Sequence, residues 1–247
     1  MYNPYSLEGK TILITGASSG IGRATAIECS KLGAKLVIHG RNIERLHDTL
    51  DFLEGENHIL VAGDLTTDQG IETLIEGIPA LDGAFFCAGV TDTTPLKFVS
   101  DEKIDRVFSI NFKAPYLLTQ RLVKRKKLNF NASLVYMSSM GAEEITPGLG
   151  IYAASKNALN ALMKSVAIEL VGRKIRSNSI MPMMIKTELV DNISSISEEQ
   201  LKLDEGKYPF GYGQPSDVAF AAIYLLSDAS RWVTGSIIKM DGGSTLV

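Results

Sequence analysis

The chain has little of what would place it in several broad classes of protein. Only two of its 247 residues are cysteines. Cys29 and Cys87 both stand in apolar surroundings, which excludes a disulfide framework and favours a reducing compartment. No uninterrupted apolar stretch approaches membrane-spanning length. The segment Met1 to Gly9 has no basic region leading into an apolar run, so we expect no signal peptide and a cytoplasmic protein without a membrane partner.

Basic residues are not in excess either. Lysine and arginine total 25 against 28 aspartates and glutamates, a net charge of −3, and the pI is near 5.7. This balance argues against a dedicated nucleic-acid binder. The densest basic run, Lys124–Lys127, ends a predicted helix, where it can complement the helix dipole. Hydrophobic residues make up 45% of the chain, enough for a sizeable core.

Short apolar runs alternate with helical segments along the whole chain. Continuous Val/Ile/Leu strands in such an alternation indicate a parallel sheet covered on both faces. We therefore predict an α/β fold, a single doubly wound Rossmann-type domain over residues 1–247 with a seven-stranded parallel sheet. The predicted strands are Lys10–Thr15, Lys35–Gly40, His58–Ala62, Leu81–Cys87, Ser133–Met137, Ile175–Met181 and Ser236–Met240. The predicted helices are Gly20–Leu32, Ile43–Leu53, Asp68–Gly77, Asp101–Lys127, Ile151–Val171 and Asp217–Leu226.

One region departs from this alternation. Between Thr187 and Pro215 the chain gathers Ser, Glu, Lys and Gly. Loops of this length inside a compact domain often act as lids over a site. We expect residues 187–215 to form a substrate loop, with a surface insertion as the alternative.

A glycine-rich turn, Thr15–Gly22, joins the first strand to the first helix. Glycines at 16, 20 and 22 allow a tight turn and a close approach to a pyrophosphate, which the helix N-terminus also attracts. The spacing is G-x-x-x-G-x-G, so the general G-x-G-x-x-G fingerprint fails as written. With a strand and a helix on either side, the turn favours a phosphate cradle over a purely structural role.

The end of the second strand distinguishes the two nicotinamide dinucleotides. A carboxylate there would pair with the ribose hydroxyls of NAD, whereas an arginine accommodates the 2′-phosphate of NADP. The chain has Arg41 there and no acid, which favours NADP over a merely solvated arginine. Asp64, after the third strand, is placed either to accept from the adenine amino group or to cap the following helix.

Tyr152 and Lys156 stand four residues apart on a predicted helix, so their side chains share a face. An ammonium beside a phenol favours the phenolate, and we expect the pKa of Tyr152 to fall towards the neutral range. Such a tyrosine exchanges a proton with an alcohol oxygen. Taken alone, however, the spacing Tyr-x-x-x-Lys more often marks two solvent-exposed side chains on a helix without a catalytic role.

The ordered motifs together resemble the short-chain dehydrogenase/reductase family over almost the whole chain, and they outweigh that common meaning. The motifs are Thr15–Gly22, Asp64-Leu65, Ala88-Gly89, Asn111, Ser139, Tyr152, Lys156, Thr234-Gly235 and Asp241-Gly242-Gly243.

The resemblance implies a role for each member of a catalytic set. Tyr152 is implied as general acid in reduction and base in oxidation, and Lys156 as the residue that lowers the Tyr152 pKa and holds the nicotinamide ribose. Ser139 is implied to donate to the substrate carbonyl, and Asn111 to anchor a water in the proton relay. Ser138 is expected to be structural.

The resemblance also implies a cofactor set, in which Thr187 binds the nicotinamide carboxamide, and no metal site. The set is Gly16, Ser18, Ser19, Gly20, Ile21, Gly22, Arg41, Asp64, Leu65, Ala88, Gly89, Tyr152, Lys156, Pro182, Ile185 and Thr187.

Two positions depart from the family pattern. Cys87 stands where the family usually has an asparagine, which puts the local hydrogen bonds in doubt. Met183 stands where the family favours a glycine after the sixth strand, so the nicotinamide wall is expected to differ. We expect a core role for this methionine rather than a substrate contact.

Within the family, the chain looks most like the 3-oxoacyl-[acyl-carrier-protein] reductase type, which uses NADPH. That type implies a carrier-bound thioester substrate, with Arg173 and Lys124–Lys127 near the carrier contacts or simply as solvated helix ends. The alternatives are an NADP-dependent reductase of another ketone or sugar-derived secondary alcohol, and a non-catalytic dinucleotide-binding sensor. The family also implies a homotetramer that packs through the two long helices, for which Ala153, Ala158, Ala161 and Ala167 leave room.

Overall fold

The computed structural model describes residues 2–187 and 203–246, and within them the chain forms a parallel sheet. Seven strands pair in the order β3-β2-β1-β4-β5-β6-β7, and every pairing is parallel. The predicted doubly wound fold is confirmed. The strands are β1 (Thr11–Thr15), β2 (Lys35–Gly40), β3 (Ile59–Ala62), β4 (Leu81–Phe86), β5 (Leu128–Met137), β6 (Arg176–Pro182) and β7 (Ile237–Met240).

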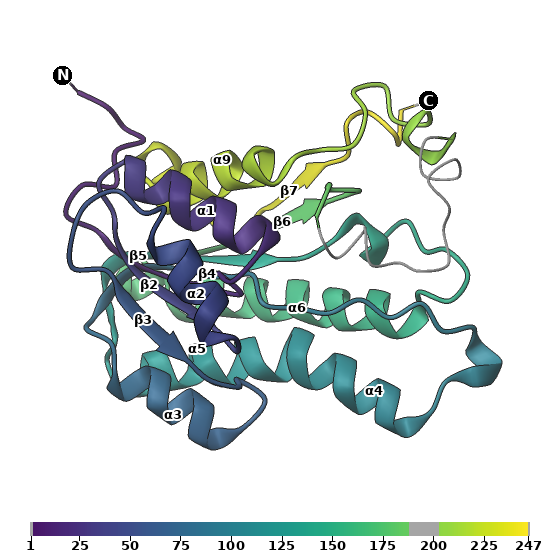
Figure 1. Ribbon diagram of the computed structural model, residues 1–247, viewed down its shortest axis with the longest axis horizontal. Coiled ribbons are helices and arrows are strands. Elements are labelled where there is room, and N and C mark those ends of the chain that lie inside the picture. The colour runs from purple at the N-terminus through teal and green to yellow at the C-terminus, as the bar shows by residue number, and fades with distance from the viewer. Residues whose placement is uncertain (1, 188–202, 247) are drawn as a thin grey trace.

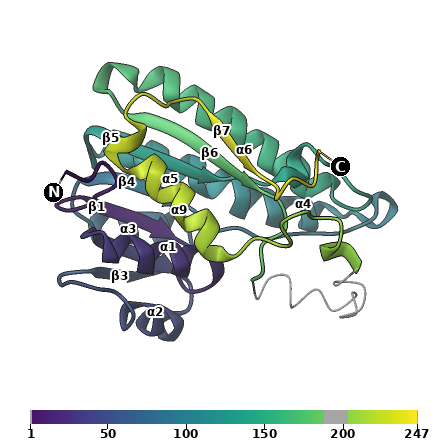
Figure 2. The same cartoon turned by 90° about the horizontal axis from the view of Figure 1, so that it is seen from above.

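Helices cover both faces of the sheet (Figures 1 and 2). Each central strand feeds two cores because successive side chains point to opposite faces. Ile12 and Ile14 of β1 belong to one core, and Leu13 between them belongs to the other. One face carries α1 (Gly20–Lys31), α2 (Ile43–Leu50) and α9 (Pro215–Leu226). The other carries α3 (Asp68–Glu76), α5 (Ala114–Lys124) and α6 (Gly150–Glu169).

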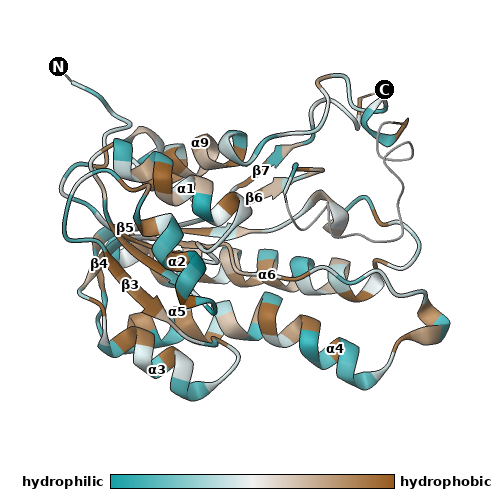
Figure 3. Ribbon diagram, viewed as in Figure 1, coloured by the Kyte–Doolittle hydropathy of each residue, from teal (hydrophilic) through white to brown (hydrophobic). Residues whose placement is uncertain are grey.

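Hydropathy follows this layering (Figure 3). The strands β1 and β2 and the second half of β5 are mostly apolar, whereas β6 begins with the polar run Arg176–Ser179. The helices turn their polar sides outward. Among the described residues, no helix combines the length and the apolar character needed to cross a membrane.

The order of the strands fixes where a ligand can bind. The chain runs outward from β1 to β3, then returns to place β4 on the other side of β1. The loops after β1 and β4 therefore leave the sheet in opposite directions and open a crevice between them. In open α/β sheets such a switch point is the usual binding site.

The predicted long helix Asp101–Lys127 is wrong as a single element. The structure has α4 (Asp101–Phe108), a π-helical turn η2 (Ser109–Lys113) and then α5. Pro115 explains the break, because proline has no N–H for the carbonyl four residues earlier and its ring crowds that carbonyl. The wider turn absorbs one extra residue, a feature that often marks functional sites.

The strand after α5 also begins earlier than predicted. Lys126 adopts a left-handed conformation with φ 53° and ends the helix. β5 then starts at Leu128, which pairs with Leu81, and its register shifts before Ser133 pairs with Gly83. Asn131, at φ 64°, lies within this irregular part. The first residues of β5 include polar side chains, so a prediction based on apolar runs started the strand only at Ser133.

The end of β2 holds a buried histidine. His39 is 2% exposed, and neither ring nitrogen has a hydrogen-bond partner among the described residues. Burial lowers the pKa of His39 from 6.5 to about 4, and the nearby Asp64 carboxylate offsets only part of this. His39 is therefore neutral in the folded protein at neutral pH.

This histidine makes the protein acid-sensitive. Between pH 6.5 and 4 the unfolded chain binds a proton at His39 that the folded chain does not, so stability present above pH 6.5 is lost on acidification. From pH 7 to 4.5, the unfolding free energy of the wild type should fall by about 2 kcal/mol more than that of His39→Gln. Urea unfolding at both pH values measures this. His47→Gln, at an exposed position of α2, is the matched control for the substitution itself.

Candidate active site

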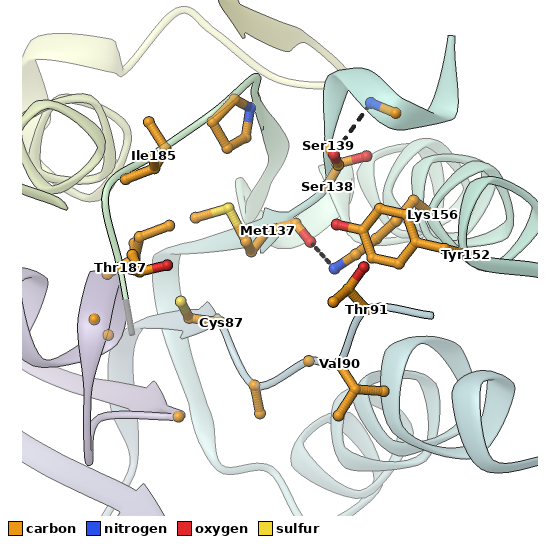
Figure 4. Close-up of a pocket in the computed structure, with 18 of the residues that line it drawn as sticks. Cys87, Val90, Thr91, Met137, Ser138, Ser139, Tyr152, Lys156, Ile185 and Thr187 are labelled. Carbon is orange, nitrogen blue, oxygen red and sulfur yellow. Dashed lines mark hydrogen bonds between the residues drawn. The ribbon is translucent and has the colours of Figure 1, made fainter. Parts of the chain in front are cut away.

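A cavity of about 1180 Å³ opens at the carboxyl ends of the strands. Loops after β1, β2, β3, β4, β5 and β6 contribute to its wall, and α6 adds two side chains (Figure 4). Every residue of the predicted catalytic and cofactor sets lines it, except Asn111. Of the predicted substrate loop, Thr187 and residues 203–215 are described, and 188–202 lie outside the described residues.

The glycine turn is shaped by close backbone contacts. Gly16 has φ +70°, and a Cβ there would lie 2.9 Å from the Ala88 backbone. A Cβ on Gly22 would lie 2.2 Å from the carbonyl oxygen of Gly16. Neither position has room for a side chain, so the turn keeps its backbone exposed to the cavity ahead of α1. This is the cradle that a pyrophosphate needs.

Thr15, which the sequence analysis did not single out, holds this turn against β4. Its hydroxyl oxygen accepts from the backbone N–H of Cys87 at 3.0 Å and from that of Ala88 at 3.2 Å. The sequence analysis questioned the local hydrogen bonds at Cys87, where the family usually has asparagine. The hydrogen bond from Cys87 to Thr15 uses the backbone N–H and does not depend on the side chain. Burial raises the pKa of the Cys87 thiol to about 12, so the thiol is neutral. In the sequence, the position of Thr15 directly before the first glycine of the turn could have indicated this role.

After β2 and β3, respectively, Arg41 and Asp64 both line the cavity, where the sequence predicts the adenosine half of the cofactor. Hydrogen bonds from the Thr66 backbone and hydroxyl, at 2.9 and 2.8 Å, lower the pKa of Asp64 and keep it ionised. The proposal that Asp64 caps the following helix is wrong. Thr67 is the N-cap of α3, and its hydroxyl accepts from Gly70 N.

The catalytic candidates converge on the far half of the cavity (Figure 4). Tyr152 and Lys156 lie one turn apart on α6, and Ser139 follows β5. The Ser139 hydroxyl oxygen accepts from Gly141 N at 3.1 Å. The Lys156 ammonium lies 5.7 Å from the centre of the Tyr152 ring and donates to the Met137 carbonyl at 2.7 Å.

The expected lowering of the Tyr152 pKa is wrong for this structure. Burial raises the pKa, and a hydrogen bond with Ser139 lowers it by less. Lys156 directs its ammonium to the Met137 carbonyl rather than to the phenol oxygen. Burial lowers the pKa of Lys156 itself to about 8. A buried phenol is costly to ionise, and this cost exceeds what the hydrogen bond with Ser139 recovers.

Asn111 lies behind the cavity wall, in the π-helical turn, and is 1% exposed. Its side-chain amide exchanges two hydrogen bonds with the Val90 backbone, each at 2.9 Å. It also donates to the Ser155 hydroxyl at 3.1 Å, and that hydroxyl donates to the Tyr152 carbonyl at 2.7 Å. Asn111 therefore joins the loop after β4 to the helix that carries Tyr152 and Lys156.

The remaining wall is mostly apolar. Met183 and Met184 line the cavity, and Met183 also packs against the small core around Met140 and Met181. Two tyrosines that the sequence analysis did not single out, Tyr208 and Tyr212, complete this wall with their rings 5.0 Å apart.

An acidic side chain holds this tyrosine pair. The Tyr212 hydroxyl donates to Asp204 at 2.7 Å, and Asp204 lines the cavity with both rings. Within the described ranges, no cluster of His, Cys, Asp or Glu side chains is placed to hold a metal ion.

Comparison with known proteins agrees with this arrangement. A family model described as enoyl-(acyl carrier protein) reductase matches residues 16–245. A 3-oxoacyl-[acyl-carrier-protein] reductase of Rickettsia felis is 36% identical over 242 residues, covering 98% of this chain and 99% of the relative. One of Thermotoga maritima is 33% identical over 244 residues, covering 96% and 98%.

Solved structures give the same result. An angucycline C-6 ketoreductase with bound NADP superposes with a TM-score of 0.90 at 27% identity, covering 98% of both chains. A putative gluconate dehydrogenase of Agrobacterium tumefaciens superposes with a TM-score of 0.90 at 25% identity, covering 100% of both. The chain therefore belongs to the short-chain dehydrogenase/reductase family, whose members use a nicotinamide cofactor, and it is an oxidoreductase acting on CH–OH or C=O groups.

Proposed function

We propose that the protein is a cytoplasmic, NADP(H)-dependent reductase of 3-oxoacyl thioesters. One observation carries the proposal: the Ser139–Tyr152–Lys156 cluster and the glycine turn with Arg41 open into the same cavity. The names of the relatives from Rickettsia felis and Thermotoga maritima support the substrate class.

The catalytic cluster suits carbonyl reduction. A bound nicotinamide cofactor supplies the hydride. Ser139 donates to the carbonyl oxygen and stabilises the negative charge that develops there. Tyr152 then protonates that oxygen, and its raised pKa keeps the phenol protonated at neutral pH, the state that an acid requires. In the reverse direction the tyrosine acts as base.

Lys156 and Asn111 support this proton transfer. With a pKa of about 8, Lys156 is mostly protonated at pH 7 and places a positive charge near the phenol. Asn111 fixes Val90 and, through Ser155, the first turns of α6. We assign to Asn111 the anchoring of a water in the relay.

The cavity residues fit a dinucleotide of the NADP type. The turn Gly16–Gly22 would hold the pyrophosphate at the start of α1, with Asp64 and Leu65 beside the adenine. Arg41 would pair with the 2′-phosphate, since no carboxylate ends β2 to repel it. Ala88, Gly89, Pro182, Ile185 and Thr187 would line the nicotinamide half.

A carrier-bound substrate would approach basic residues outside the cavity. Arg173 donates to the Leu128 carbonyl and is half-buried, so it is partly engaged within the fold. Arg125 pairs with Glu72 at 3.1 Å and remains more than half exposed. Lys124–Lys127 directly precede β5 and therefore lie at the amino ends of the strands, opposite the cavity of the same subunit. We assign Arg125 and its neighbours the larger share of the contacts with a carrier whose substrate enters the cavity of another copy in the proposed tetramer.

Reduction of another ketone, or oxidation of a sugar-derived secondary alcohol, is the second candidate. The aromatic wall of Tyr208 and Tyr212, whose rings meet edge to face at 74°, favours it, because an aromatic surface suits a cyclic substrate. The structurally similar angucycline ketoreductase is named for such a compound.

We further propose a homotetramer that packs through α5 and α6. A groove of about 230 Å³ lies between these helices, lined by Tyr116, Val123 and Leu162 among others. Tyr116 is 47% exposed there. Of the four alanines predicted to face a partner, Ala153 and Ala167 are buried within the subunit, which leaves Ala158 and Ala161 for a contact between copies.

The substrate class is tested by turnover. The purified protein should oxidise NADPH with acetoacetyl-thioesters, followed by the loss of nicotinamide absorbance. Tyr152→Phe should lower kcat at least about a hundredfold, because proton transfer contributes that much, while the Kd for NADPH changes less than about twofold. Turnover of simple ketones but not thioesters would refute the acyl-reductase assignment. Turnover retained in Tyr152→Phe would refute the role of the phenol.

Cofactor choice is tested by direct binding. Arg41→Ala should raise the Kd for NADPH at least about tenfold, because a charge-assisted pair with the 2′-phosphate is lost. The Kd for NADH should change less than about twofold, since NADH has no such phosphate. Titration of nucleotide fluorescence measures both constants, and equal losses would contradict the assigned role of Arg41.

A further inference from the structure

Two polar side chains tie the glycine turn to α2, although neither lines the cavity. Arg23 lies in the first turn of α1 and Thr49 in the last turn of α2. The two helices lie side by side on the same face of the sheet in both views (Figures 1 and 2). Thr49 is 0% exposed, so its hydroxyl has to find its partners within the protein.

Both side chains reach the backbone of the glycine turn. The Thr49 hydroxyl donates to the Ala17 carbonyl at 2.9 Å and accepts from Arg23 Nε at 3.0 Å. Arg23 Nη2 donates to the Ser18 carbonyl at 2.9 Å. Two consecutive carbonyls of the turn are thus held by one threonine and one arginine.

Arg23 and Thr49 also both contact a backbone carbonyl within α2. Arg23 Nη2 also lies 3.3 Å from the Arg45 carbonyl, and the Thr49 hydroxyl lies 3.0 Å from that oxygen. The planar guanidinium serves carbonyls of two segments at once, which an ammonium on a flexible stem does not reproduce. The position of α2 relative to the turn is therefore set by this pair.

The start of α2 carries the residue that faces the 2′-phosphate. Asn42 is the N-cap of α2, and its side chain accepts from Arg45 N at 2.9 Å. Arg41 directly precedes this cap. A Cβ on Gly40 would lie 3.2 Å from the Ser18 hydroxyl oxygen, so the end of β2 already touches the turn. A shift of α2 would move Arg41 relative to Ser18.

We propose that Arg23 and Thr49 are positioning residues that set the place of Arg41 and thereby the preference for the 2′-phosphate. The inference rests on the proposed preference for NADP(H). The pair acts through Arg41 and not on the nucleotide itself. Its effect should therefore appear only with a nucleotide that carries the 2′-phosphate, and only while Arg41 is present.

A double-mutant cycle on nucleotide binding tests this. Thr49→Val keeps the shape of the side chain and removes its hydroxyl. It should raise the Kd for NADPH about fivefold to tenfold, the usual loss for one or two hydrogen bonds, and that for NADH less than about twofold. In an Arg41→Ala background, Thr49→Val should change the Kd for NADPH less than about twofold, because coupled residues are not additive. A purely structural role would give the same loss in both backgrounds.

Matched variants keep the test decisive. Thr49→Ser retains the hydroxyl and should bind NADPH within about twofold of the wild type. Arg23→Lys keeps the charge and loses the planar fork, so it should behave like Thr49→Val. If Thr49→Val does not fold, Arg23→Lys carries the same cycle.

The outcomes separate the two proposals. A wild type that prefers NADPH, combined with equal losses in the two Arg41 backgrounds, would overturn the positioning role alone. A wild type that binds NADH as tightly as NADPH would overturn the proposed NADP(H) preference, and the inference with it. NADPH-specific losses that vanish without Arg41 would establish the positioning role.

Discussion

The contact between Thr15 and the start of the loop after β4 is the constraint on which the site depends. One hydroxyl oxygen accepts two successive backbone N–H groups, at 3.0 and 3.2 Å. This pins together the two loops that diverge at the switch point of the sheet. Gly16 can then approach Ala88 with no room for a Cβ. The proposed phosphate cradle and the proposed nicotinamide wall are therefore joined directly to each other rather than built on two independent loops.

Burial sets the protonation states of Tyr152 and Lys156, the proposed catalytic pair. The phenol of Tyr152 and the ammonium of Lys156 are both withdrawn from water, and burial disfavours the charged form of each. Tyr152 is thereby kept protonated at neutral pH, and Lys156, with a pKa of about 8, titrates close to neutral pH. Such a site suits reduction, in which the tyrosine must arrive with its proton.

Much of the fold was predictable because the central strands are continuously apolar and the turns between them are marked by glycine. Ile12–Ile14 show this, as each residue serves one of two cores. The break at Ser109–Lys113 was not predicted, because an apolar period continues through it and only Pro115 signals the change. The extension of β5 to Leu128 depends on pairing with a strand distant in sequence, which a local pattern does not contain.

The candidate site divides in the same way. Motif order located Tyr152, Lys156, Ser139 and the glycine turn, all of which line one cavity. The Tyr152 pKa was predicted with the wrong sign, because spacing shows a neighbouring charge but not the depth of burial. Arg23 and Thr49 were not found, because the role proposed for them rests on hydrogen bonds to backbone carbonyls. Every residue has such a carbonyl, so the sequence pattern gives no sign of these bonds.

The π-helical turn that holds Asn111 has a consequence for how the chain tolerates changes in length. Each residue of a regular helix advances the side chains by about 100°. Because the wider turn absorbs one extra residue, deleting a residue from Ser109–Lys113 would restore a regular helix and leave the outward faces of α4 and α5 nearly unchanged. Within the turn itself, however, the residues that remain would be rotated by roughly that angle. Asn111 would then turn away from Val90 and Ser155, its partners on two other segments. The length of this turn is thus constrained, even though Ile110 alone of its residues lines the cavity.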